Sequence, residues 1–354
     1  MELQNFIDSN EDYIQQFRDH GLKVTKYSKY KCILVKNYYD KPLSYTNEED
    51  YWKMYCRGAI IDTENNRVIC LPPVKGIELD LTKDFTLADG EIQCSIDGTM
   101  VNLFFRNNEW IVATRSEIGG YNKWTNKKSF STMFQECSDI DYSELKKDCS
   151  YSFVMRHREN RNVSPIDKNE LYLVEVYSYG FGAVRRLPLD EYPENILRVE
   201  NCPLTELENM KNNYSTKGYT IKDGNKRYNL TSPEFKKVKE LKINMNNHLL
   251  NYIELRKNGN LTEYLKYFPE HSKLFSQYRE KVHNLSNQLY SEYKNVFIFK
   301  TNQKKDIPYH LKPLIYDIHG IYKKTKNPIT WQTIKDYIHS LPSKKLTFAI
   351  NYLN

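Results

Sequence analysis

The sequence predicts an α+β protein in which an antiparallel sheet domain is followed by an all-helical C-terminal domain. Up to about residue 230, short β-branched and aromatic runs alternate with brief polar turns, which is typical of antiparallel strands. From Phe235 onward, apolar residues recur every three or four positions, as they do on amphipathic helices. The length of 354 residues suits two domains. We expect a helical segment over 1–26, the sheet domain over 27–234 and the helical domain over 235–354.

The strands are expected where apolar runs are bounded by turn residues. Glu64-Asn65-Asn66 predicts a hairpin between 59–62 and 67–70, and Asp223-Gly224 predicts one between 219–222 and 227–230. Further strands are expected over 32–35, 92–97, 100–105, 110–115, 151–155 and 171–176. A helix and a loop are expected over 195–211.

The helical domain is predicted from the spacing of its apolar residues and from its prolines. The periodic residues include Leu249, Tyr252, Ile253, Leu261, Tyr264, Leu265, Phe275, Tyr278, Val282, Leu285 and Leu289. Proline is tolerated in the first turn of a helix and disrupts a helix interior, so it separates successive helices. Pro269, Pro308, Pro313, Pro328 and Pro342 therefore indicate several helices in series.

Composition excludes several classes of protein. Hydrophobic residues make up 40% and charged residues 27%, so the chain is not disordered as a whole. No apolar run approaches the ~20 residues that cross a bilayer, and 1–10 lacks the pattern of a secretory signal. The seven cysteines are odd in number and form no C-x-x-C pair. This spacing indicates neither a disulfide framework nor a zinc site, and we expect buried thiols in a reducing compartment.

The charge balance permits a polyanionic partner without requiring one. The chain carries 52 Lys and Arg against 45 Asp and Glu, a net charge of +7. Aromatic residues interleaved with lysines suit single-stranded nucleic acid. With 29 Tyr and abundant Lys and Asn, however, such interleaving also arises by chance from the composition of an A+T-rich genome, and we favour that interpretation.

Three ordered segments carry the specific signal. Tyr55-Cys56-Arg57-Gly58 leads into a strand, Ser95-Ile96-Asp97-Gly98 follows another, and Asn160-Arg161 precedes the strand that ends near Tyr177. In order and spacing these segments resemble the nucleotidyltransferase domain of phage-type RNA ligases, a member of the wider ligase and capping-enzyme superfamily. The resemblance covers about 27–241 and implies an antiparallel nucleotidyltransferase core (ATP-grasp-like ligase). The helical region resembles that of uncharacterised ligase-like proteins of large DNA viruses.

The resemblance implies a defined chemistry. In the family, a lysine attacks the α-phosphate of ATP and releases pyrophosphate. Cationic groups spread the phosphate charge, and acidic residues hold a divalent metal ion such as Mg²⁺. The adenylate then passes to a 5′-phosphate, and a 3′-hydroxyl displaces AMP. ATP and Mg²⁺ are thus the expected cofactors if the pocket is retained.

This chain departs from the family pattern at three positions. Ser95 replaces the nucleophilic lysine, Lys217-Gly218 stands where the family has Glu-Gly, and Asn229-Leu230-Thr231 replaces a Lys-x-Lys strand. Serine cannot form the same P–N bond, and a lysine cannot support a metal ion as a glutamate does. We therefore expect a ligase-like protein that has lost covalent adenylation and serves as a scaffold for a nucleotide, an RNA or DNA end, or a viral protein.

Other ligand-like residues remain. The resemblance places Arg57, Asp97, Arg115 and Glu175 around a nucleotide pocket, with Gly98, Lys217 and Lys222 as further phosphate contacts. Each of these residues also has an interpretation that involves no ligand. Asp97-Gly98 would be an ordinary turn and Glu175 an outward position on a strand. The arginines would be paired surface or interdomain residues. Lys75, after Pro72-Pro73-Val74, is a candidate substitute nucleophile.

Two other functions stay open. The first is an active ATP-dependent RNA ligase that uses a displaced lysine such as Lys75. The second is a structural virion protein whose former pocket is filled by side chains. All three functions are compatible with the host cytoplasm or a virion, and none requires a membrane.

Overall fold

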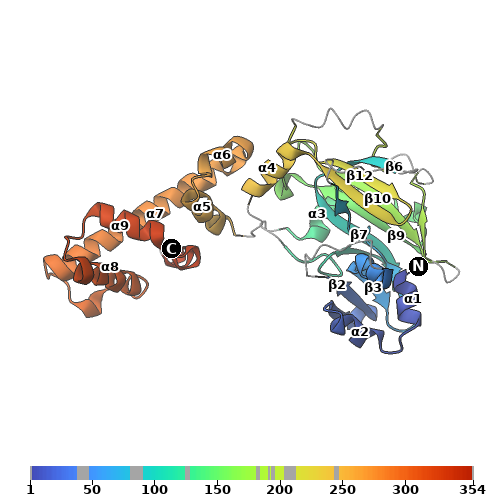
Figure 1. The fold of residues 1–354 in the computed structure, drawn as a ribbon, viewed down its shortest axis with the longest axis horizontal. Helices are drawn as coiled ribbons and strands as arrows, with labels where there is room; N and C mark the ends of the chain where they lie inside the picture. The colour runs from blue at the N-terminus through green and yellow to red at the C-terminus, as the bar shows by residue number, and fades with distance from the viewer. Residues whose placement is uncertain are drawn as a thin grey trace. The chain divides into compact units, whose positions relative to one another are not determined.

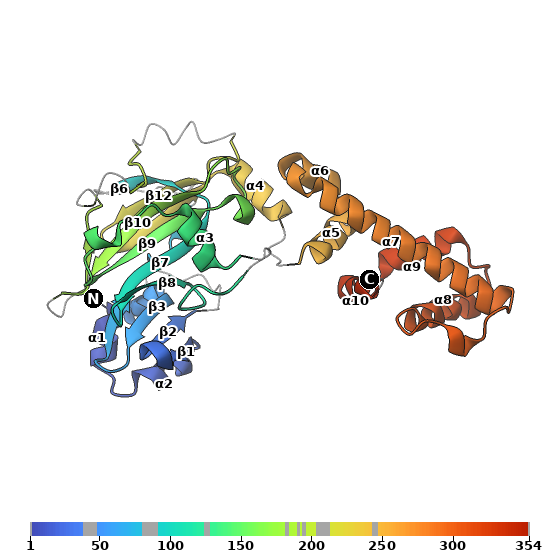
Figure 2. The same ribbon diagram turned by 180° about the vertical axis from the view of Figure 1, so that it is seen from behind.

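The computed structural model describes residues 2–37, 48–79, 91–123, 128–180, 184–189, 192, 196–202, 213–242 and 247–352. Contacts divide the chain into two compact units, Met1–Lys239 and Glu240–Asn354. The first unit contains three sheets and the second is helical (Figures 1 and 2), which confirms the predicted α+β class. Among the described helices, none is long and apolar enough to cross a membrane.

The first sheet contains four antiparallel strands in the order β1-β2-β3-β4. They are β1 (Lys23–Tyr27), β2 (Cys32–Lys36), β3 (Arg57–Asp62) and β4 (Arg67–Cys70), preceded by helices α1 (Glu2–Asp8) and α2 (Tyr13–Asp19). The N-terminal segment, for which we expected only helix, thus also contributes β1, because Val24 and Thr25 pair with Val35 and Leu34 of β2. The predicted hairpin between β3 and β4 is confirmed.

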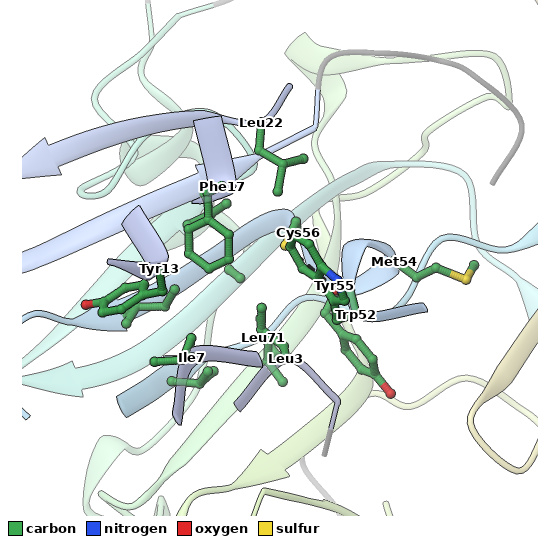
Figure 3. Close-up of a cluster of buried hydrophobic side chains, with 14 of the residues drawn as sticks. Leu3, Ile7, Tyr13, Phe17, Leu22, Trp52, Met54, Tyr55, Cys56 and Leu71 are labelled. Carbon is green, nitrogen blue, oxygen red and sulfur yellow. Dashed lines mark hydrogen bonds between the residues drawn. The ribbon is translucent and has the colours of Figure 1, made fainter. Parts of the chain in front are cut away.

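A core of aromatic residues attaches the N-terminal helices to this sheet. Trp52, in the 3₁₀ helix Glu48–Tyr55, lies 3.9 Å from the ring of Phe6 in α1 and 5.6 Å from that of Phe17 in α2. Figure 3 shows Trp52, Phe17 and Leu3 converging in this cluster. The helices are short, so burial of these rings rather than helix propensity holds them in place.

The second sheet has five antiparallel strands in the order β11-β10-β9-β7-β8. They are β7 (Thr99–Arg106), β8 (Glu109–Thr114), β9 (Cys149–Arg156), β10 (Glu170–Ser178) and β11 (Arg185–Leu187). Asn107 and Asn108 both have positive φ, as a tight hairpin turn requires. Helix α3 (Phe130–Cys137) packs on this sheet, with the ring of Phe134 5.8 Å from that of Phe153.

The third sheet has the order β5-β13-β12-β6. It lies on one side of the candidate functional site, and the second sheet lies on the other side. Its strands are β5 (Ile77–Glu78), β6 (Glu91–Ser95), β12 (Gly218–Asp223) and β13 (Lys226–Thr231), and the short β5–β13 pair is parallel. The hairpin predicted from Asp223-Gly224 joins β12 to β13, with Gly224 at a φ of 55°.

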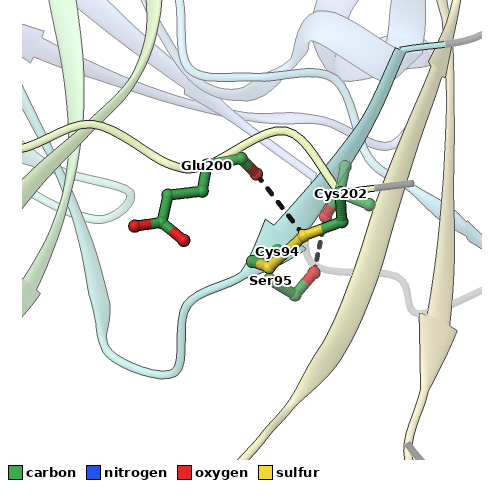
Figure 4. The surroundings of a disulfide bond; sticks show 5 residues. Cys94, Ser95, Glu200 and Cys202 are labelled. Carbon is green, nitrogen blue, oxygen red and sulfur yellow. Dashed lines mark hydrogen bonds between the residues drawn. A yellow bond between two sulfur atoms is a disulfide. The ribbon is translucent and has the colours of Figure 1, made fainter. Parts of the chain in front are cut away.

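Two segments beside β6 bear on the expectations. Of the helix and loop expected over 195–211, the structure describes residues 196–202, which contain no helix, because Asn201 pairs with Gln93 of β6 and Arg198 with Leu173 of β10. Asn195 and 203–211 lie outside the described residues. Cys202 forms a disulfide with Cys94, 108 positions earlier, which the cysteine spacing did not indicate. The other five cysteines are free thiols, and four of them are buried. Figure 4 shows the disulfide next to Ser95.

The helical unit follows α4 (Pro233–Leu241), whose Phe235 and Val238 are buried. Its helices are α5 (His248–Lys257), α6 (Leu261–Tyr267), α7 (Ser272–Tyr293), α8 (Lys312–Thr325), α9 (Trp331–Ser340) and α10 (Ser343–Asn351). The prolines act as predicted, with Pro313 in the first turn of α8 and Pro342 as the N-cap residue of α10. A 3₁₀ turn, Pro269–His271, leads into α7.

Candidate functional site: a cation-lined pocket

A pocket of about 240 Å³ lies between the second and third sheets of the first unit. Strands β6, β12 and β13 line it from one sheet, and β7, β9 and β10 line it from the other. The apolar part of its lining includes Met100, Val154, Val174 and Val199. We call this cavity the central pocket.

Four cationic side chains line the central pocket: Arg57, Arg115, Lys217 and Arg227. Among the described residues that line it, none is an aspartate or a glutamate. The polar remainder consists of groups such as Ser95, Thr220 and Asn229. A small cavity with several cations and no carboxylate is complementary to a polyanion such as a phosphate chain.

Two glycines explain how the cations reach the pocket. Gly58 has a φ of 113°, and a Cβ added to it would lie 3.0 Å from the backbone Cα of Arg115. A glycine therefore lets β3 approach that backbone closely, which places Arg57 beside Arg115. Gly218 has a φ of 131°, and an added Cβ would lie 2.0 Å from the carbonyl oxygen of Leu230. Close packing of β12 on β13 thus fixes the position of Lys217.

Ser95, which the sequence analysis aligned with the nucleophilic lysine of RNA ligases, ends strand β6 in the wall of the pocket. Its hydroxyl lies 2.6 Å from the hydroxyl of Thr220 and is hydrogen-bonded to it. No histidine or carboxylate of the described residues lines the pocket as a base for this serine. Ser95 is therefore a weakly acidic hydroxyl whose hydrogen-bond partner is neutral.

Lys217 lies close to Ser95 because Gly218, the next residue, pairs directly with Ser95 across β12 and β6. Within the described part of the chain, its ammonium group makes no hydrogen bond or ion pair. Burial lowers the pKa of Lys217, and the nearby charges of Arg227 and Lys239 act in the same direction. The negative charge of Asp97 opposes these effects without cancelling them. Lys217 is the lysine that lines the pocket, and it loses its proton more readily than an exposed lysine does.

Asp97 does not line the central pocket. Its carboxylate accepts hydrogen bonds of 2.8 Å from the backbone N–H groups of Val163 and Ser164. It therefore anchors the loop after Asn160-Arg161, which is a structural use of the Asp-Gly turn. Its neighbour Gly98 does line the pocket.

Glu175 is buried in β10, and only 3% of its surface is exposed. Its carboxylate accepts hydrogen bonds from Arg227 at 2.9 Å and from the hydroxyl of Tyr177 at 2.6 Å, and the ammonium group of Lys222 lies 3.7 Å away. Burial lowers the pKa of Lys222. This network lines two hollows beside the central pocket, and through Arg227 it supports one of the pocket cations.

Lys75 is half-buried in the segment after Pro72-Pro73, and it does not line the pocket although Val74 and Gly76 do. Arg227 does line it, and our sequence analysis did not single it out. The sequence gives only a weak indication of this role, because Arg227 is one of several charged residues in a predicted hairpin strand. Only the pairing of β13 with β12 shows that it points toward Glu175.

The residues present do not fit a protein-held Mg²⁺ ion. Such an ion prefers carboxylate oxygens, and no carboxylate of the described residues lines the pocket. The two carboxylates that the resemblance placed there, Asp97 and Glu175, are engaged as described above. Across the described residues, no group of three or more His, Cys, Asp and Glu side chains is arranged to hold a metal ion.

No model of a known protein family matches the chain. One curated relative, "Immediate-early protein ICP-46 homolog" of Invertebrate iridescent virus 3, is 22% identical over 226 residues. The match covers 58% of this chain, which spans about half the length of that relative. The relative comes from a large DNA virus, as the sequence analysis expected.

Solved structures with a similar arrangement are ligases. "Putative ATP-dependent DNA ligase" of Aquifex aeolicus is 12% identical with a TM-score of 0.43, covering 89% of this chain and 81% of that one. An archaeal ATP-dependent RNA ligase is 13% identical with a TM-score of 0.41, covering 96% and 76%. Because the likenesses are weak, the function is inferred from the pocket itself.

Proposed function

We propose that the first unit is a ligase-like scaffold whose central pocket binds the phosphate chain of a nucleotide such as ATP without covalent transfer. The observation that carries this proposal is the lining of four cations without a carboxylate. Charge-assisted hydrogen bonds from arginine suit phosphate oxygens, and Val154 and Val174 provide an apolar surface for the rest of the ligand.

The site chemistry favours binding over transfer. The hydroxyl of Ser95 is paired with Thr220 and has no base beside it, so it lacks the activation that a covalent nucleophile needs. Since the residues present do not fit a metal ion, binding should not depend on Mg²⁺ held by the protein. The arginines neutralise the phosphate charge in its place.

Calorimetry with ATP and GTP, in EDTA and in Mg²⁺, tests this proposal. We expect binding in both conditions, and we expect Arg115→Ala to weaken it by about 10- to 100-fold, because a charged hydrogen bond contributes roughly 1.5–3 kcal/mol. Arg185→Ala is the matched control, since Arg185 is exposed on β11 and does not line the pocket. Absence of binding, or equal losses in both variants, would contradict the proposal.

A second candidate function is an active ATP-dependent ligase with a displaced nucleophile, and the position of Lys217 favours it specifically. Lys217 lies one residue from the partner of Ser95, and burial lowers its pKa. In this reaction the neutral amine attacks the α-phosphate of ATP. An N–P bond forms, the bond to the bridging oxygen breaks, pyrophosphate leaves, and the amine proton passes to solvent. The adenylate would then pass to a 5′-phosphate end of RNA or DNA.

Incubation with α-labelled ATP, followed by denaturing electrophoresis, separates the two functions. Noncovalent binding predicts an unlabelled protein. A displaced nucleophile predicts label that Lys217→Arg abolishes and Lys75→Ala retains. Label that survives Lys217→Arg would exclude Lys217 as the nucleophile.

A further inference from the structure

The positive charge of the protein is concentrated in the helical unit. Residues 240–354 contain 18 Lys and Arg against nine Asp and Glu, a net charge of +9. Residues 1–239 contain 34 against 36, a net charge of −2. The mild basic excess of the whole chain therefore conceals a strongly basic helical unit, which is the electrostatic signature of polyanion binding.

The end of α7 presents aromatic rings on the surface of this unit. Helix α7 continues into a π-helical turn, Lys294–Ile298, and Lys300 has a positive φ of 57° that ends it. This wide turn leaves 60% of Phe299 and 52% of Ile298 exposed. π-Helical turns are rare and occur often at functional sites.

A stack of rings from α8 continues this feature. The ring of Phe297 lies 3.9 Å from that of His319 at an interplanar angle of 12°. His319 in turn lies 5.9 Å from Tyr322 at 25°, and 40% of Tyr322 is exposed. The stack therefore ends in a ring that solvent, or another ring, can reach.

Lysines surround these rings without acidic partners. Lys294 lies 4.8 Å from the ring of Tyr290 and 5.5 Å from that of Phe299, and Lys304 lies 5.8 Å from the ring of Phe297. Burial first, and then the charges of Lys323 and Lys304, lower the pKa of His319. Within the described residues, Lys294, Lys304 and Lys323 form no salt bridge, and the nearby Asp306 accepts a hydrogen bond from the backbone of Gln303.

We propose that this basic aromatic surface, made of Lys294, Phe297, Phe299, Lys304, Tyr322 and Lys323, binds single-stranded nucleic acid. Exposed rings provide stacking faces for bases, and unpaired lysines beside them provide counter-charges for the backbone phosphates. A protein partner would require acidic groups placed to match these lysines, and a membrane would require a broader apolar face than Ile298 and Phe299 present. The proposal concerns the second unit and does not depend on nucleotide binding in the central pocket.

Fluorescence anisotropy with the full-length chain and a labelled 12-nucleotide oligo(U) tests this surface. We expect Phe299→Ala to weaken binding by about 5- to 100-fold, the range for loss of one stacked base. Lys294→Ala should reduce the slope of log affinity against log salt by about 0.7. Phe348→Ala and Lys335→Ala are the matched controls, because both side chains are exposed in the same unit and neither belongs to the basic aromatic surface. These controls should bind as the unmodified protein does.

Three results would overturn the proposal. One is unchanged affinity in Phe299→Ala and in Lys294→Ala, with folding verified by circular dichroism. Another is binding to vesicles with anionic lipids without binding to the oligonucleotide. The third is loss of oligonucleotide binding in Arg57→Ala together with competition by ATP, which would place the strand in the central pocket. If ATP does not bind but the oligonucleotide binds as predicted, only the proposed function of the central pocket is contradicted.

Discussion

Cationic residues are held differently in the two units of this protein. In the first unit, Lys222 and Arg227 are largely buried and meet the carboxylate of Glu175. In the second, Lys294 and Lys304 lie over aromatic rings and form no salt bridge among the described residues. The first unit also contains all seven cysteines of the chain, and two of them form a disulfide.

This difference separates charges that maintain the fold from charges available to a ligand. A buried cation that loses its partner leaves an uncompensated charge in a poorly solvated place, which is strongly destabilising. An exposed lysine is already solvated, so its removal costs little stability and changes only what the surface attracts. Substitutions in the buried network around Glu175 should therefore affect stability, whereas those on the basic aromatic surface should affect binding alone.

The largest expected effect comes from the disulfide. Cys94 and Cys202 close a loop of 108 residues, and a cross-link of that length stabilises a fold by up to about 5 kcal/mol. We expect Cys202→Ala, or a reducing agent, to lower the free energy of unfolding of the first unit by about this amount. Thermal denaturation followed by calorimetry measures the change.

The second unit has no cysteine and serves as an internal reference. Its unfolding transition should remain in place when the reducing agent is added. Cys137→Ala is the control within the first unit, because Cys137 is a half-buried thiol outside the disulfide. If the reducing agent shifts the unfolding transitions of both units, or if Cys137→Ala lowers the stability as much as Cys202→Ala does, the stabilisation does not come from this cross-link.

The next effect comes from the buried charge network. Glu175→Gln removes the buried negative charge that Lys222 and Arg227 share, and leaves Lys222 with the carboxylate of Glu91 at 3.9 Å. We expect the free energy of unfolding to fall by about 3–5 kcal/mol, the cost of breaking a buried ion pair from one side. Denaturant titration measures it.

The matched comparison is Lys304→Ala on the basic aromatic surface. Because Lys304 is exposed and forms no salt bridge among the described residues, its loss should change stability by less than about 0.5 kcal/mol. A second variant, Lys222→Met in the Glu175→Gln background, should recover part of the loss, because it removes one of the two buried cations that Glu175 had balanced. If Glu175→Gln and Lys304→Ala lower the free energy of unfolding by similar amounts, the cations of the two units do not differ in their contribution to stability.

The sequence predicted the elements of the fold whose signals are local. The β12–β13 hairpin follows from Asp223-Gly224, and the ends of the C-terminal helices follow from residues such as Pro313 and Pro342. These signals lie within a few residues of the structure that they specify. The motif order also pointed to Arg57, Ser95 and Arg115, which the structure brings into one pocket.

The features that the sequence could not predict depend on pairing between distant segments. The Cys94–Cys202 disulfide needs the pairing of Gln93 with Asn201, which no local pattern encodes. Strand β1 forms because its backbone pairs with the edge of β2. The functional meaning of Lys217 likewise comes from the register that sets Gly218 against Ser95.

The smallest predicted effect is the pH dependence of nucleotide binding, and its sign separates the two candidate functions. Burial lowers the pKa of Lys217 from the ordinary value of 10.5, so this residue loses its charge at a lower pH than a surface lysine does. If the ammonium group binds phosphate, ATP affinity should fall by about tenfold as pH rises through that lowered pKa, which corresponds to one charged hydrogen bond. Calorimetry above pH 7.5, where the phosphates of ATP stay ionised, measures this fall.

Lys217→Arg keeps its charge throughout that range, so its affinity should be nearly independent of pH. If Lys217 is instead a nucleophile, attack requires the neutral amine, and covalent labelling should increase over the same pH range in which binding weakens. The direction of the pH profile thus distinguishes a cation that holds phosphate from an amine that attacks it. If neither ATP affinity nor covalent labelling of the unmodified protein changes with pH, Lys217 has neither role. Arg57, Arg115 and Arg227 are then the groups that define the site.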